Sequence, residues 1–107
     1  MRLFHATTLR AARIIRDSGF RNARGSYGLV DEQTGRRIIV EGVFLADRIL
    51  TCSEGVSPDA TAYFRIVIPG KLISRFEWIE EGKGYREWCV PANIVNRHFQ
   101  DRTIRSC

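Results

Sequence analysis

The stretch RLFHATTLRAARIIRDSGF, residues 2–20, decides the fold class, because it joins a strand pattern directly to a helix pattern. Residues 2–6 alternate as a β-strand does, which puts His5 on one face of the predicted strand. Two threonines then supply an N-cap for a helix over residues 9–18, whose apolar residues form a single stripe. Gly19 is well placed to end that helix. The stretch therefore predicts one strand followed at once by one helix.

The rest of the chain reads mostly as strands separated by turn signals. Residues 61–69 give the clearest alternation, and the Glu-Gly-Lys-Gly run at residues 81–84 indicates a hairpin. The order of strand, helix and then mostly strands predicts one α+β domain over residues 1–107, with a sheet rich in antiparallel pairs. We expect strands near 27–30 and over 36–40, 42–46, 61–69, 76–80 and 85–90. Between them we expect a loop over 21–29, a turn at 31–35 and a turn or helical turn within 71–75. A short helix or edge element within 91–99 and loose chain after about residue 100 complete the prediction.

The composition is that of an ordinary globular domain. Of 107 residues, 44% are hydrophobic and 27% are charged, and no apolar run approaches the roughly 20 residues of a membrane span. The first residues read as a strand rather than a signal peptide, so we expect a cytoplasmic location and no membrane partner. The three cysteines are widely spaced and odd in number, which argues against a metal site and against a disulfide framework.

The charge is basic, arginine-rich and uneven along the chain. The net charge of +5 comes from 15 Arg and 2 Lys against 12 acids. Residues 1–37 hold 8 Arg against 3 acids, whereas residues 38–81 hold 4 basic residues against 7 acids. Because arginine favours planar contact with phosphates, a basic N-terminal third suits a phosphate-bearing ligand or nucleic acid. A solvated arginine-rich face is the alternative interpretation.

Three short patches carry residue types associated with chemistry. His5 ends a predicted strand just before a helix N-terminus, where free N–H groups suit an anionic or polar ligand. Residues 42–47, GVFLAD, combine a glycine that permits close backbone approach with the aromatic ring of Phe44. Glu87 stands directly before Trp-Cys-Val in a predicted strand, although burying an unpaired carboxylate is costly. Each patch also has an ordinary structural interpretation: a satisfied histidine, a core strand, and a half-exposed glutamate paired with a nearby arginine.

Together, in this order, the patches resemble the motifs of the ADP-ribosyltransferase superfamily, in the histidine–tyrosine–glutamate branch that includes diphtheria toxin and the poly(ADP-ribose) polymerases. The family's His-Gly-Ser/Thr motif corresponds to residues 5–7, HAT, followed by the predicted helix. Its second motif corresponds to residues 42–47, GVFLAD, and its Tyr-x-Glu motif to residues 85–90, YREWCV. The resemblance covers residues 3–94 and implies a small, bacterial-type single-domain member. The fold it implies is a split antiparallel β-sandwich whose cleft holds NAD.

The resemblance also implies roles for residues at matching positions. His5 would hydrogen-bond a ribose hydroxyl of NAD, the backbone of Ala6 would hold the nicotinamide amide, and Thr7 would support the ribose. Phe44 would stack on the nicotinamide ring, and Glu87 would bond and orient the nicotinamide ribose. Glu87 and His5 are thus the expected catalytic residues, and no metal is required. Ala6 stands where the family has glycine, and Phe44 stands where it has tyrosine.

Further residues are expected along the same cleft. Gly42 and Ser53 would line it, and Glu54 is either a second carboxylate in the site or a turn acid. Arg24 and Tyr27 lie on the stretch that would close over NAD, where either would reach the diphosphate.

The expected activity is cleavage of the nicotinamide–ribose bond of NAD with transfer of ADP-ribose to a macromolecular acceptor, protein or nucleic acid. A toxin would be a typical small representative. Two alternatives stay open. One is an RNA 2′-phosphotransferase of related fold, which the arginines suit. The other is a catalytically degenerate module that binds NAD or a partner, which the changes at Ala6 and Phe44 favour.

Overall fold

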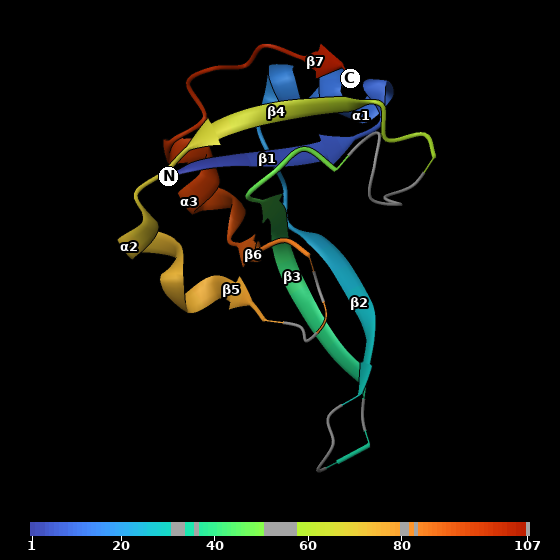
Figure 1. The fold of residues 1–107 in the computed structure, drawn as a ribbon. Helices are drawn as coiled ribbons and strands as arrows, with labels where there is room; N and C mark the ends of the chain where they lie inside the picture. The colour runs from blue at the N-terminus through green and yellow to red at the C-terminus, as the bar shows by residue number, and fades with distance from the viewer. Residues whose placement is uncertain (31–33, 36, 51–57, 80–81, 83, 107) are drawn as a thin grey trace.

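The computed structural model describes residues 1–30, 34–35, 37–50, 58–79, 82 and 84–106, with the backbone alone described at 24–30 and 37–40 (Figure 1). None of the described helices is long and apolar enough to cross a membrane. The elements in chain order are β1 (Arg2–Thr7), α1 (Leu9–Ser18), β2 (Ala23–Val30), β3 (Arg37–Ala46), β4 (Ala62–Val67), α2 (Gly70–Ile73), the 3₁₀ helix η1 (Ser74–Phe76), β5 (Glu77–Trp78), β6 (Glu87–Val90), α3 (Ala92–Arg97) and β7 (Arg105–Ser106).

Six strands form one antiparallel sheet in the order β5-β6-β3-β1-β4-β7, and β2 pairs with β3 outside this path. The predicted α+β class, with a helix directly after the first strand, is confirmed. The predicted hairpin around residues 81–84 is confirmed as well, because β5 pairs antiparallel with β6. The short helix expected within 91–99 is α3.

The long strand β3 serves two pairings in succession. Its first half pairs with β2 up to Ala23 opposite Gly42, and its second half pairs with β6 from Val43 opposite Val90. Figure 1 shows the β2–β3 ribbon running away from the other strands as a two-stranded arm. Gly42 therefore marks the point where β3 passes from the arm into the main sheet.

The hydrophobic core lies on one face of the main sheet and is closed by α1 and α3. Ala12 of α1 and Val95 of α3 are fully buried against the strands. Between them lies a cluster of three aromatic rings whose centroids are 4.7 to 5.9 Å apart. The sheet contributes alternate residues to this core: Leu3, Val43, Leu45, Ala62, Phe64, Ile66, Trp88 and Val90.

The ends of α1 follow the sequence signals. The Thr8 hydroxyl accepts a hydrogen bond from the Ala11 N–H at 3.1 Å, as an N-cap does. Gly19 ends the helix with φ of 82°, a left-handed value that glycine adopts without strain. Beyond it, Asn96 of α3 donates to the Phe20 carbonyl at 3.0 Å and accepts from the Phe20 N–H at 2.8 Å. This pair of bonds fixes the end of α1 against α3.

Three sequence expectations differ from the structure. The loop predicted over 21–29 is wrong, because β2 occupies most of that stretch. The glycines that suggested a loop are outweighed by backbone pairing with β3. The strand predicted over 76–80 is shorter, with η1 followed by the two residues of β5. The chain after residue 100, expected to be loose, adds β7, which pairs with β4.

Replacing Gly42 with alanine should destabilise the fold. A Cβ at this position would lie 2.8 Å from the Cys89 Sγ and 2.9 Å from the Val90 carbonyl oxygen, and the backbone oxygen cannot rotate away. We expect Gly42→Ala to lower the free energy of unfolding by about 1–3 kcal/mol, as overpacking does, measured by urea denaturation. Gly70→Ala is the matched control, because a Cβ there meets no atom within 4 Å. Equal stability of the two variants would contradict this packing.

Candidate active site

The three sequence patches lie on neighbouring strands. The strands that carry them are β1, β3 and β6, and β3 lies between the other two. Ala46 of β3 is the joining position, because it stands opposite Phe4 of β1 and opposite Glu87 of β6. Segments that are far apart in the sequence are thus brought together around one residue.

The register decides which face of the sheet each side chain takes, because successive residues of a strand point to opposite faces. Leu45 and its partner Trp88 point into the core. Phe44 and Ala46, with their partners Cys89 and Glu87, therefore point to the opposite face, which we call the Glu87 face. The structure brings the expected stacking residue and the expected catalytic carboxylate onto this same face, on adjacent strands.

His5 takes the other face. It stands opposite Phe64 and shares its side of β1 with Leu3, both of which are core residues. Its ring packs edge-on against Phe20, with centroids 5.1 Å apart. The register therefore separates His5 from Glu87 across the sheet and does not bring the two expected catalytic residues onto one face.

A hydrogen bond nevertheless connects His5 to the second patch. The Nδ1 atom lies 2.8 Å from the carbonyl oxygen of Phe44. Because a carbonyl only accepts, Nδ1 carries the proton, and in the neutral ring Nε2 is then an acceptor. Burial lowers the pKa of His5, and the bond to the Phe44 carbonyl opposes this in part. His5 thus holds the backbone of β3 at the aromatic position of the second patch.

The backbone at Ala6 lies where β1 and β3 separate. The Ile68 N–H donates to the Met1 carbonyl, so odd-numbered residues of β1 direct their backbone groups toward β4. The N–H and C=O of Ala6 are therefore turned toward β3. Among the described residues, Phe4 opposite Ala46 is the pair that joins these two strands, and further along the His5 ring bonds the Phe44 carbonyl. Ala6 lies just past the last paired position.

Glu87 is buried, with 6% of its surface exposed, and is the one buried charged residue in the described part of the chain. The alternative of a half-exposed strand glutamate is therefore wrong. Its carboxylate is close to the Cys89 thiol, whose pKa is raised by burial and further by the Glu87 charge. The adjacent Arg86 pairs with Glu77, at 2.7 and 2.9 Å.

The remaining predicted residues are placed as follows. Thr7 is half-buried at the end of β1, opposite Ala62. Gly42 packs closely against Cys89 and the following backbone. The backbone positions of Arg24 and Tyr27 belong to β2, and their side chains lie outside the described residues, as do Ser53 and Glu54.

Several residues near Glu87 were not among the predicted site residues. Trp78 of β5 stands opposite Glu87. Tyr85 and Arg48 contact each other, with the guanidinium 5.7 Å from the ring centroid. Asp47 accepts a hydrogen bond from the Arg86 N–H at 3.1 Å and so fixes the chain where β6 begins. Tyr85 belongs to the Tyr-x-Glu motif quoted from the sequence, but the partner strands of that segment cannot be read from the sequence.

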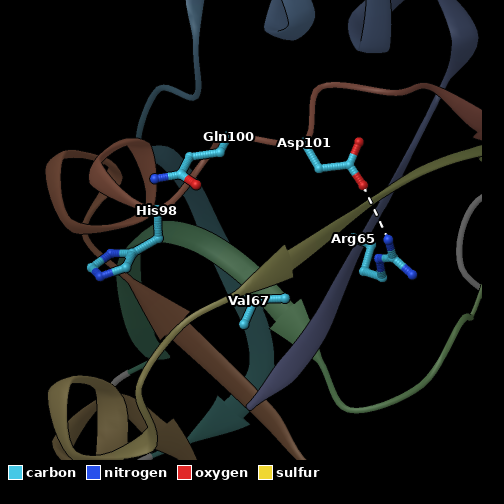
Figure 2. A pocket seen from close by; sticks show the side chains of 5 residues that line it. All are labelled: Arg65, Val67, His98, Gln100 and Asp101. Carbon is cyan, nitrogen blue, oxygen red and sulfur yellow. Dashed lines mark hydrogen bonds and ion pairs between the residues drawn. The ribbon is translucent and has the colours of Figure 1, made fainter.

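A separate cavity of about 300 Å³ lies at the outer part of the sheet (Figure 2). It is lined by Arg65, Val67, His98, Gln100 and Asp101, and none of these was a predicted site residue. The Nδ1 atom of His98 lies 3.1 Å from the Ile94 carbonyl oxygen. No group of three or more residues suited to a metal ion occurs in the part of the chain that the structure describes.

Comparison with known proteins gives no relative. No family model, no curated protein and no solved structure matches the chain.

The lowered pKa of His5 should make stability depend on pH. The folded protein binds a proton at this ring less readily than the unfolded chain, whose pKa is about 6.5. The stability due to neutral His5 is therefore complete above about pH 6.5 and is lost as the pH falls toward the folded pKa. We expect the free energy of unfolding to fall between about pH 7 and 5, before the carboxylates titrate.

In His5→Gln this pH dependence should flatten, because the amide still donates to the Phe44 carbonyl but takes up no proton. His98→Gln removes the other histidine and should keep the slope. Denaturant unfolding at each pH measures both variants, and an unchanged slope in His5→Gln would refute the assignment.

Proposed function

We propose that this protein is an ADP-ribosyltransferase-like enzyme that cleaves the nicotinamide–ribose bond of NAD and transfers ADP-ribose to a macromolecular acceptor. One observation carries the proposal: the three motif-bearing strands are neighbours, with Phe44 and a buried Glu87 on one face at adjacent strands. A buried carboxylate on the same sheet face as an aromatic side chain is the type of group that active sites use, and this placement supports the proposal.

The split β-sandwich is the fold proposed with this function. Its support is the single pair that joins β1 to β3, after which the two strands separate. The His5 ring bonds the Phe44 carbonyl just beyond that pair. The backbone N–H and C=O of Ala6, turned toward β3, are then the groups that would hold the nicotinamide amide.

On the Glu87 face, the ring of the half-buried Phe44 would stack on the nicotinamide ring. Glu87 would bond the adjoining ribose from the neighbouring strand. His5 lies on the opposite face, so in this proposal it acts at the place where β1 and β3 separate. Its Nδ1 holds Phe44 in place, and Nε2 is the ring atom that would accept a hydrogen bond from a ribose hydroxyl.

The chemistry follows from these positions. As the bond from the ribose C1′ to the nicotinamide nitrogen breaks, its electron pair goes to the ring, which leaves as neutral nicotinamide. The sugar gains oxocarbenium character, and the fixed carboxylate of Glu87 stabilises that positive charge. The acceptor nucleophile then forms the new bond to C1′ and gives its proton to Glu87. Stacking and the amide contact keep the nicotinamide oriented for departure.

The test is release of nicotinamide from NAD, measured with label in the nicotinamide and, separately, in the adenylate. We expect Glu87→Gln to lower the rate by about 10²–10³-fold, the usual effect of removing one transition-state stabilising group. Glu77→Gln is the matched control, because Glu77 precedes the site on β5 and pairs with Arg86. Its rate should stay near that of the wild type. No nicotinamide release by the wild type, or equal rates in both variants, would overturn the proposal.

Calorimetry with NAD and an assay with 2′-phosphorylated RNA test the two alternative functions. Binding of NAD without turnover would indicate a degenerate binding module, which the loss of the tyrosine hydroxyl at Phe44 favours. Loss of 2′-phosphate from a phosphorylated RNA in the presence of NAD would instead indicate the phosphotransferase.

A further inference from the structure

The two basic segments of the sequence meet in the folded protein. Residues 1–37 carry 8 Arg against 3 acids, and residues 82–107 carry 5 basic residues against 2 acids. The acidic middle of the chain lies between them in sequence. In the structure, Arg102 reaches back to α1 and donates from Nη1 to the Arg16 carbonyl at 2.8 Å. This bond brings part of each basic segment, α1 and the chain at Arg102, onto one surface.

The arginines of this surface are in line. Arg10, Arg13 and Arg16 are exposed on α1 at intervals of three residues, about 4.5 Å of helix rise each. Arg102, also exposed, continues the row beyond the end of the helix. Its guanidinium lies 4.7 Å from the ring centroid of Phe99, which holds it against the protein. We call these four residues the arginine track.

Among the described residues, one acidic side chain bonds an arginine of the track. Asp17 bonds Arg16 at 3.2 Å, whereas Arg10 and Arg13 have no acidic partner within the described residues.

Asp101, next to Arg102 in sequence, is occupied elsewhere. Arg65 and Arg105 bond its carboxylate at 3.3 and 3.2 Å, and Figure 2 shows the first of these pairs. Hydrogen bonds from Thr103, together with Arg105, lower the pKa of Asp101 to about 2. The Asp101 carboxylate is therefore negatively charged at neutral pH, but it is already paired with Arg65 and Arg105. The track keeps a net positive charge.

We propose that the arginine track binds the sugar–phosphate backbone of a nucleic acid. The planar guanidinium contacts phosphate oxygens in pairs, which suits a row of arginines to a row of phosphates. A membrane-surface helix would present a whole apolar face. On α1, Ala12 is buried and Ile15 packs against the core. Its exposed large apolar residues are Leu9 and Ile14, which are five residues apart and do not form a continuous face. This binding is independent of NAD cleavage, because the track lies on the core side of the sheet, away from the Glu87 face.

The experiment is fluorescence anisotropy with a short labelled single-stranded RNA and a DNA of the same sequence, from about 50 to 200 mM salt. Four phosphate contacts predict a slope of log K against log salt near −2.8, about −0.7 for each contact. Arg10→Gln with Arg13→Gln should reduce the slope by about 1.4 and weaken binding roughly 25-fold at 0.1 M salt. Glutamine keeps the helix, and the corresponding double lysine variant, which keeps both charges, should retain the slope.

The matched control is Lys71→Gln with Arg75→Gln, which removes the same charge at α2 and η1. Figure 1 shows α2 at the far end of β1 from α1. This variant and Glu87→Gln should bind as the wild type does, so failure of the track and failure of the NAD site are distinguishable. Equal weakening by both double variants, or binding to phosphatidylserine vesicles but not to either oligonucleotide, would overturn the proposal.

Discussion

The pairing of residues 43–46 of β3 with β6, and of Ala46 with β1, is the constraint on which the molecule depends. Ala46 stands opposite Phe4 on one side and Glu87 on the other. Because side chains alternate along a strand, this one register assigns every neighbouring residue to the core or to the opposite face. A shift by one position would move Trp88 and Val90 out of the core cluster and would carry Glu87 into it. The burial of the core therefore also fixes where the carboxylate lies.

The same register makes the two halves of the candidate site unequal. Phe44 and Glu87 are held on one face by adjacent paired strands, so their relative positions follow from the sheet itself. His5 is connected through one hydrogen bond to a backbone carbonyl and lies against Phe20 on the core side. The hydrogen bond from the histidine accordingly positions the backbone of β3.

The ends of the chain show how packing redistributes charge. The aromatic cluster of Phe20, Phe64 and Phe99 draws the end of α1 and the end of α3 onto the same part of the sheet. Asn96 bonds the backbone on both sides of Phe20, which fixes that approach. Arg102 follows directly and extends the basic face of α1. An apolar cluster thus determines where a charged surface forms.

The sequence by itself determined the local features: the first strand, the capped helix after it, the hairpin near residue 82 and the α+β class. Each depends on neighbouring residues, such as the Thr8 cap, the glycine at 19, or alternation within one strand. The expectation that the three patches contribute to one cleft came from their resemblance to a family, not from local pattern. Only the tertiary structure decided that the glycine-containing stretch before Val30 is a strand, that His5 and Glu87 take opposite faces, and that the two basic ends meet. Those outcomes depend on pairing and packing between segments that are distant in the sequence. A local sequence pattern does not indicate which distant segment it will pair with.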